Sequence, residues 1–208
     1  MRYPSDQKAR AKQAILQAGA RALRTKGFNG IGVDGLAASA GVTSGAFYSN
    51  FSNKQALLED VIETCLGEPF IDSQSGSLTQ RQDRLKEWLA MYISADHRAD
   101  PASGCVMPTL SADVARSNPQ IRAAYRRKML ALVHKMSNVL DGTGPDREKR
   151  AWSIVAMMVG AIAISRAMPD GEAADQVLDS ALQTAIALIA ANPGARERSP
   201  ASPSSTAS

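Results

Sequence analysis

The stretch from Ile31 to Lys54, IGVDGLAASAGVTSGAFYSNFSNK, constrains the fold of this chain more than any other. Its apolar positions follow a helical period in two short segments. Gly41 stands between these segments, where a helix can end in the left-handed conformation at no steric cost. Thr43 follows as a candidate N-cap of the second segment. The stretch therefore predicts two short helices joined by a tight turn, and then a third helix that begins at Lys54.

The second of these predicted helices has one apolar face and one small, polar face. Phe47 and Phe51 lie one turn apart, so we expect both rings to be buried. The other side would be small and polar enough to enter a major groove without a clash. It carries Thr43, Ser44, Gly45, Tyr48, Ser49 and Asn50. The pattern favours a helix-turn-helix, although helical proteins also contain such helix pairs without binding DNA.

The distribution of charge supports DNA binding. Residues 1–54 hold eight Lys or Arg against two Asp or Glu, which is a local charge near +6 in a chain whose net charge is +4. The remainder of the chain is therefore slightly acidic. Binding to DNA phosphates requires such a concentration of positive charge around the recognition helix.

The same region resembles the N-terminal domain of the TetR family, the tetracycline-repressor-like bacterial transcriptional regulators. The similarity covers about residues 8–68. It rests on Gly27-Phe28, Leu36-Ala37, Ala40-Gly41-Val42, Gly45-Ala46-Phe47-Tyr48, Phe51 and Lys54-Gln55-Ala56-Leu57-Leu58. The resemblance implies an all-α fold of about nine helices, with a three-helix DNA-binding domain and a C-terminal helical domain for ligand binding and dimerisation. Gly32 departs from the family, which usually has Ser or Thr there, so one phosphate contact is in question.

From the pattern and the resemblance together we predict ten DNA-contacting residues. Those expected near base edges are Thr43, Ser44, Ala46 and Ser49. Those expected to hold phosphates are Tyr48, Asn50 and Lys54. Gly32, Val33 and Gly45 complete the predicted surface.

The whole chain is interpreted as a short basic arm, two domains and a tail. Hydrophobic content of 44% with only 5% aromatic residues suits packed helices better than sheets. We expect a flexible arm at residues 1–7, the DNA-binding domain at 8–53, and the effector-binding and dimerisation domain at 54–191. A Pro/Ser-rich disordered tail should follow at 192–208. Connections are expected at 67–77 and 95–104.

Membrane and enzyme classes find little support in the sequence. The most apolar run, 151–165, is shorter than the ~20 residues that span a bilayer, and residues 1–12 lack the apolar core of a signal peptide. His97 and His134 have no metal-ligand spacing, and no catalytic motif is present. We therefore expect a cytoplasmic protein that is not an enzyme and has no cofactor and no metal.

The last two predicted helices, 146–168 and 172–191, are candidates for a homodimer interface. Both are rich in apolar residues, and the resemblance implies that they pair with a second copy as a four-helix bundle. Small residues such as Gly160, Ala161 and Ala181 would allow a close approach. The alternative is that these helices are simply core of the monomer.

The middle helices are expected to hold an effector. Methionines and aromatic residues suit irregular cavities for apolar ligands, although the same residues at helical spacing are more commonly core. The candidates are Trp88, Tyr92, Cys105, Met107, Leu110, Tyr125, Met129, Trp152, Met157 and Met158.

Cys105 carries a separate hypothesis. It precedes Pro108 and a predicted helix, whose N-terminal partial charge would lower the thiol pKa. The segment GCVMPTLSADVA is similar to that of TetR-family members that sense electrophiles or oxidants. The competing interpretation is a small buried apolar residue, and Cys65 is interpreted as purely structural.

The sequence thus predicts a ligand-responsive transcriptional repressor. It would bind double-stranded operator DNA as a homodimer and be released by a small molecule. Two other classes stay open at this stage: an effector-independent DNA-binding protein, and a helical binding protein or enzyme whose helix-turn-helix is incidental.

Overall fold

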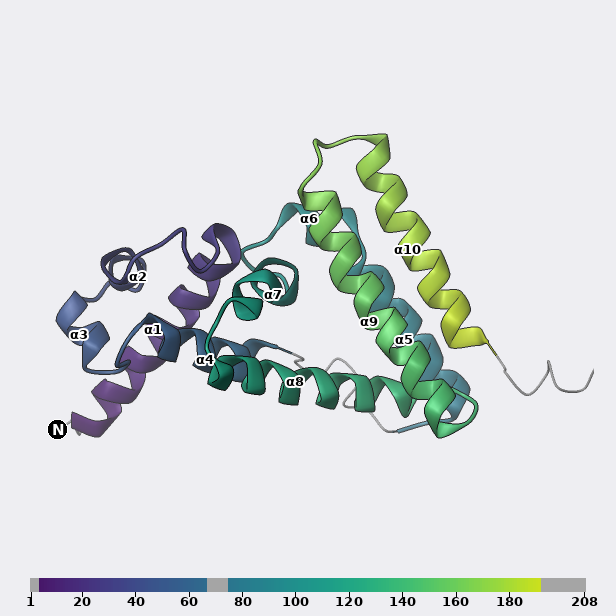
Figure 1. Ribbon diagram of the computed structural model, residues 1–208, viewed down its shortest axis with the longest axis horizontal. Helices are drawn as coiled ribbons and strands as arrows, with labels where there is room; N and C mark the ends of the chain where they lie inside the picture. Colours follow the sequence, from purple (N-terminus) through teal and green to yellow (C-terminus); the bar gives the residue numbers. More distant parts are fainter. Residues whose placement is uncertain (1–3, 67–74, 192–208) are drawn as a thin grey trace, which may run out of the picture.

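The computed structural model describes residues 4–66 and 75–191, and this part of the chain forms ten α-helices and no strand (Figure 1). The predicted all-α fold is confirmed. The helices are α1 (Pro4–Lys26), α2 (Val33–Ser39), α3 (Ser44–Tyr48), α4 (Lys54–Cys65), α5 (Leu78–Tyr92), α6 (Ala95–Ala99), α7 (Met107–Ala115), α8 (Pro119–Ser137), α9 (Gly144–Arg166) and α10 (Glu172–Ala190). The predicted tail and residues 67–74 of the predicted connection lie outside the described residues.

Two differences from the predicted organisation concern short segments. Helix α6 forms inside the expected connection 95–104, where Ser94 caps it by accepting a hydrogen bond from the His97 backbone N–H at 3.1 Å. Five residues are too few for a helical period to be visible in the sequence. At the N-terminus, α1 begins at Pro4, so residues 4–7 of the expected arm are helical, and residues 1–3 lie outside the described part.

The first four helices begin and end where their local sequence dictates. Gly27 and Gly41 adopt φ values of +69° and +67°, the left-handed conformation that glycine tolerates at helix ends. The Thr43 hydroxyl accepts from the Ala46 backbone N–H at 3.1 Å, and Asn53 caps α4 by accepting from the Ala56 N–H at 2.9 Å. The predictions of a left-handed Gly41 and a Thr43 cap are confirmed.

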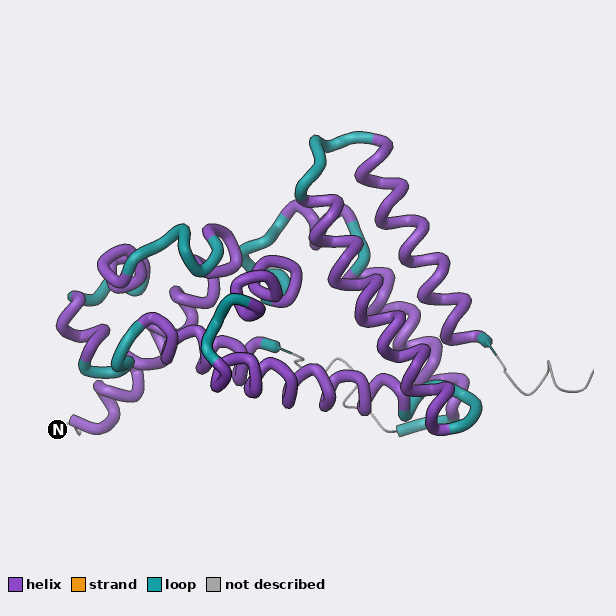
Figure 2. The backbone as a smooth tube through the Cα atoms, viewed as in Figure 1, coloured by secondary structure: helices purple, strands orange, loops and turns teal. Residues whose placement is uncertain are grey.

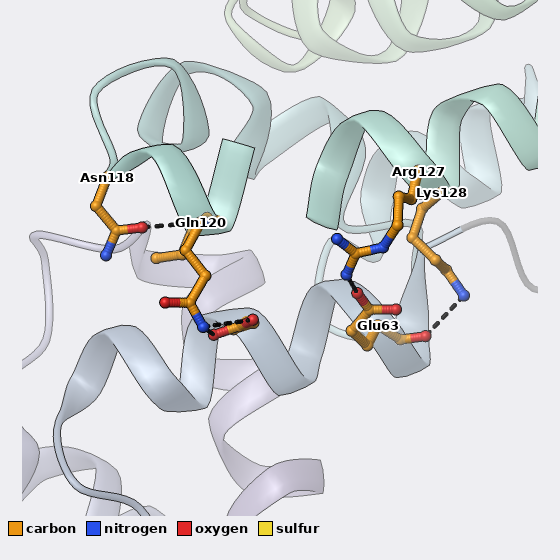
Figure 3. A network of polar contacts seen from close by, with 7 residues as sticks. Glu63, Asn118, Gln120, Arg127 and Lys128 are labelled. Carbon is orange, nitrogen blue, oxygen red and sulfur yellow. Dashed lines mark hydrogen bonds and ion pairs between the residues drawn. The ribbon is translucent and has the colours of Figure 1, made fainter. Parts of the chain in front are cut away.

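The helices form an elongated arrangement, with α2 and α3 at one end and α9 and α10 side by side at the other (Figures 1 and 2). Helix α4 packs against both α1 and α8, so it joins the two ends. In the described part of the chain, a single apolar core extends from Phe47 in α3 to Ile154 in α9. Along the α4–α8 contact, polar side chains of Glu63, Arg127 and Lys128 meet at the surface (Figure 3).

Candidate DNA-binding surface and effector cavity

Helix α3, the predicted recognition helix, is held in place by the packing of its own aromatic residues. Phe47 is fully buried, and its ring centroid lies 5.7 Å from that of Phe51. Tyr48 contacts the edge of Phe47 at 5.6 Å while remaining 56% exposed. A five-residue helix has little stability of its own. The orientation of α3 therefore depends on this packing and on its Thr43 cap.

None of the ten predicted DNA-contacting residues is buried, and several are bonded within the domain. The Ser44 hydroxyl donates to Asp34 Oδ1 at 2.6 Å, and the Ser49 hydroxyl donates to the Gly45 carbonyl at 2.9 Å. Both bonds use the hydroxyl hydrogens. The two serine oxygens are thereby oriented as acceptors, suited to the amino groups that cytosine and adenine present in the major groove.

Lys54, at the start of α4, is bonded more extensively than the sequence suggests. Its ammonium donates to the carbonyls of Phe28 at 2.7 Å and Ile31 at 3.1 Å, and it lies 4.2 Å from the centroid of the Phe28 ring. These bonds hold the segment between α1 and α2. One of the three ammonium hydrogens is left for a phosphate, and that contact stays a prediction.

A cavity of about 360 Å³ lies where the end of α1 meets helices from the later part of the chain. Six parts of the chain contribute to its wall: α1, α4, α5, the segment 103–105, α7 and α8. The lining residues are Arg24, Thr64, Cys65, Trp88, Tyr92, Ser103, Gly104, Cys105, Met107 and Leu132. Four of the ten predicted effector-binding residues are among them, namely Trp88, Tyr92, Cys105 and Met107.

The other six predicted effector-binding residues lie elsewhere among the described residues. Leu110, Met129 and Met158 are buried in the core. Tyr125 is bonded to Ser111 at 2.7 Å. Met157 lines a separate hollow between α9 and α10, and Trp152, on α9, is 38% exposed. Arg24 and Cys65 line the cavity although the sequence analysis did not propose them.

The Cys105 thiol lies in surroundings that oppose the expected lowering of its pKa. Burial raises the pKa of this thiol, and interactions with Tyr92 and the Met107 backbone N–H offset the effect only in part. The Met107 N–H points to Cys105 Sγ at 3.4 Å, so the expected placement before a helix is confirmed. Desolvation outweighs the helix N-terminus, and the prediction of a low-pKa thiol is wrong.

His97 fixes the backbone of the segment that carries Cys105. The Cys105 backbone N–H donates to His97 Nε2 at 3.1 Å, so Nε2 is unprotonated and Nδ1 donates to the Tyr92 carbonyl at 2.6 Å. Burial lowers the pKa of His97, which agrees with a neutral ring. A Cβ on Gly104 would lie 2.5 Å from Nε2, so only glycine allows this approach.

The cavity is in direct contact with the DNA-binding domain. Arg24 belongs to α1, and its guanidinium donates to the Ala102 carbonyl at 3.2 Å. In α7, the Thr109 hydroxyl donates to the Arg24 carbonyl at 3.0 Å. Asp113 accepts a hydrogen bond from the Phe28 backbone N–H at 2.9 Å. Helix α7 therefore connects the cavity to the end of α1. Helix α4, which also lines the cavity and packs against α1, provides a second connection.

The outer face of α9 and α10 is apolar and partly open. A hollow between the two helices is lined by Met157, Gly160, Ile164, Val177 and Ala181 among others, and Ile164 is 50% exposed. An exposed isoleucine beside several half-buried apolar residues on one face is typical of interaction surfaces.

Within residues 4–66 and 75–191, no three His, Cys, Asp or Glu side chains come together as a possible metal site. No helix in the described part of the chain is long and apolar enough to cross a membrane.

Comparisons with known proteins agree with this architecture. Residues 15–61 match the model of the bacterial regulatory proteins of the tetR family. A TetR-family transcriptional regulator from Cytophaga hutchinsonii is 22% identical with a TM-score of 0.71, covering 88% of this chain and 95% of its own. The regulatory protein TetR from Rhodobacter sphaeroides is 21% identical with a TM-score of 0.66, covering 86% and 98%.

A third similar structure is that of E. coli NemR in its reduced form, at 20% identity and a TM-score of 0.68. The similarity covers 84% of this chain and 94% of NemR. No curated protein sequence matches the chain.

Proposed function

We propose that this chain, which matches the tetR family of bacterial transcriptional regulators over residues 15–61 and shares the fold of its members, is a homodimeric repressor whose operator affinity is controlled by a small molecule in the cavity. Residues 8–53 form the DNA-binding domain in this proposal, and residues 54–191 bind the effector and dimerise. The observation that carries the proposal is that Arg24 of α1 lines the cavity. A ligand there would touch the DNA-binding domain itself.

The outer face of α9 and α10 is the proposed dimer interface. Its exposed Ile164 and the hollow along Gly160 would be covered by the same helices of a second copy. A helix-turn-helix dimer places its two recognition helices in successive major grooves, ~34–36 Å apart. Any change in the angle between the two DNA-binding domains then alters the fit to both half-sites.

Control by the ligand follows from a difference in its affinity for two conformations. A ligand that prefers the conformation with mismatched recognition helices shifts the population away from DNA, typically by ~1–3 kcal/mol of coupling. The contacts of α7 with Arg24 and Phe28 provide the shortest path for this coupling.

Selection of binding sites from random duplex DNA tests the proposal directly. A two-fold-symmetric enriched site is expected with the purified protein at near-physiological salt. Binding without any sequence preference, lost as salt rises, would instead indicate an effector-independent DNA-binding protein. Absence of DNA affinity at low salt would point to a helical protein whose helix-turn-helix is incidental.

Two substitutions separate base recognition from phosphate binding. Ser44→Ala removes an oriented acceptor oxygen and should change the preference among selected sites by ~1–3 kcal/mol at one base pair. Lys54→Ala should weaken binding to all sites and reduce the salt dependence. It should also lower stability, because the Phe28 and Ile31 carbonyls lose their donor. Unchanged binding by both variants would contradict this assignment of the recognition helix.

A second candidate function is redox or electrophile sensing through Cys105, the alternative raised by the sequence. Its support is that Cys65 and Cys105 both line the cavity and that NemR in its reduced form is structurally similar. The raised thiol pKa favours non-covalent binding instead. The rate of maleimide labelling of the Cys65→Ser variant, measured as a function of pH, distinguishes sensing through Cys105 from non-covalent binding. Sensing requires that Cys105 is labelled rapidly at pH 7 and that labelling releases the protein from DNA.

A further inference from the structure

The wall of the cavity contains hydrogen-bond donors that lack an acceptor. The Nε atom of Arg24 is buried without a partner among the described residues. The buried hydroxyl of Tyr92 has no good acceptor there either, since its neighbour is the weakly accepting thiol of Cys105. Tyr92 itself is 8% exposed. A buried donor without an acceptor is destabilising, so a ligand that supplies an oxygen acceptor at this place would be favoured.

The charges around the cavity favour an anion. Arg24 lies in the wall, and Arg166 is near enough to interact electrostatically with Tyr92 and Cys105. None of the described lining residues is Asp or Glu. Burial raises the pKa of both Tyr92 and Cys105, so the hydroxyl and the thiol stay protonated at neutral pH and can donate. Among the described residues, the wall offers a cationic ligand no counter-charge.

The rest of the wall is apolar and partly aromatic. The rings of Trp88 and Tyr92 lie 5.0 Å apart at 39°, and Met107 and Leu132 line other parts of the cavity. The volume of about 360 Å³ is near the lower end of the ~300–1,000 Å³ typical of ligand pockets. A flat molecule of one or two rings matches both the size and the aromatic wall.

We propose that the effector is a small aromatic carboxylate, whose carboxylate is bound by Arg24 and Tyr92 and whose ring packs against Trp88. This inference rests on the proposed function, because it names the ligand class of the same cavity. Charge-assisted hydrogen bonds from a guanidinium to a carboxylate are among the stronger polar contacts in proteins. The carboxylate of the ligand therefore distinguishes it from neutral and cationic molecules of the same shape, while its rings make apolar contact with the wall of the cavity.

Calorimetric titration of the full chain with three probes of matched shape tests the ligand class. The probes are 1-naphthoate, neutral 1-naphthamide and cationic 1-naphthylmethylammonium. We expect 1-naphthoate to bind at least about tenfold more tightly than the amide, and the cation not to bind. Equal binding of the acid and the amide, binding of the cation, or no binding of 1-naphthoate at millimolar concentration would overturn the proposal.

Two variants locate the carboxylate. Arg24→Gln should abolish the discrimination between acid and amide, and Tyr92→Phe should weaken binding of the acid by roughly three- to tenfold. The matched controls are Arg21→Gln, an exposed position on α1, and Tyr125→Phe, whose hydroxyl bonds Ser111 and does not line the cavity. Neither control should change the affinity. Discrimination retained by Arg24→Gln would place the carboxylate elsewhere and overturn the assignment.

Displacement from the selected DNA site separates this inference from the proposed function. If 1-naphthoate binds in the cavity but leaves the DNA complex intact, the ligand class stands and the effector function fails. If only compounds without a carboxylate release the DNA, the effector function stands and the ligand class fails.

Discussion

The two groups of helices that extend from the cavity are held together by different chemistry. Near the DNA-binding domain, α4 and α8 meet along exposed polar side chains. At the other end of the molecule, α9 and α10 lie side by side (Figure 1). Arg150 and Arg166 there donate to backbone carbonyls of α10 and α6, and Arg98 of α6 also pairs with Asp175 of α10.

The contact between α4 and α8 consists of weak, exposed pairs at its surface (Figure 3). Arg127 pairs with Glu63, and their side chains are 62% and 40% exposed. Gln120 donates to both carboxylate oxygens of Glu59, at 3.1 and 2.9 Å. Exposed pairs of this kind contribute ~0–1 kcal/mol each. A small displacement of α8 along α4 would therefore change the free energy of these polar contacts only slightly.

The contact between α9 and α10 contains a buried arginine. Arg150 is 6% exposed and donates to Asp146 Oδ2 at 2.9 Å and to the carbonyls of Leu188 and Ala191 at 2.8 and 3.1 Å. It also donates to the Asp141 carbonyl. One side chain thus satisfies carbonyls at the end of α10 and before α9. We infer that this end stays rigid while the α4–α8 contact adapts to a ligand.

Arg150→Met should remove the polar contacts between α9 and the end of α10 and should have the largest effect on stability of the substitutions considered. The substitution keeps the apolar volume but leaves three partly buried carbonyls and Asp146 without their donor, so unfolding should become easier by about 3 kcal/mol. Urea denaturation measures the change. Lys149→Met, at the exposed neighbouring position, is the matched control and should change stability by less than about 0.5 kcal/mol. Equal effects of the two substitutions would contradict the distinction between the two contacts.

Asp113→Ala should weaken the link between the cavity and the DNA-binding domain. The carboxylate accepts from the Phe28 N–H, and its side chain is 10% exposed, so its loss should destabilise the protein by about 1–3 kcal/mol. It should also reduce the effect of a bound ligand on DNA affinity. Asp83→Ala removes an equivalent charge from the exposed pair with Lys86 and serves as the control. If ligand and DNA remain fully coupled in Asp113→Ala, α7 does not transmit the signal.

The features that the sequence predicts well are those set by neighbours along the chain. The left-handed Gly41 and the Thr43 cap depend on one or two residues of local sequence, and the structure confirms both. The left-handed Gly27 and the Asn53 cap are of the same local kind. The buried Phe47 follows from helical periodicity in the same way. The DNA-binding domain is therefore largely predictable.

The cavity is predictable only in part, because its wall is formed by residues from segments that lie far apart in the sequence, from α1 to α8. Periodicity indicates that Trp88 and Leu110 face inward but does not indicate which inward-facing residues border empty space. Leu110 packs into the core, whereas Trp88 lines the cavity. Nothing in the sequence indicated that Arg24 lines the cavity, because a basic residue on α1 is equally consistent with an exposed face of that helix. The raised pKa of Cys105 likewise depends on burial by neighbours that are remote in sequence.

The pH dependence of stability tests whether His97, which bonds the Cys105 backbone, is buried and neutral in the folded protein. Burial lowers the pKa of His97 below its unfolded value, so the unfolded chain takes up a proton first as pH falls through about 6.5. The free energy of unfolding should therefore decrease below that pH, by at most about 1.4 kcal/mol per pH unit from this group. His97→Gln should show a flatter profile between pH 8 and 5.5. His134→Gln, at the exposed second histidine, should keep the wild-type profile, and a profile flattened equally by both substitutions would rule out His97 as the source.

The smallest expected effect is at the α4–α8 surface, where a double-mutant cycle on Glu63 and Arg127 measures the pair directly. Glu63→Gln, Arg127→Gln and the double variant should give a coupling energy below about 1 kcal/mol in urea denaturation, which falls further as salt rises. The same variants should shift the ligand concentration needed to release DNA, because a weaker contact favours the displaced conformation. A coupling energy above 2 kcal/mol, or an unchanged ligand response, would show that this contact is as rigid as the one that Arg150 holds. The adaptable part of the molecule would then have to lie at α7.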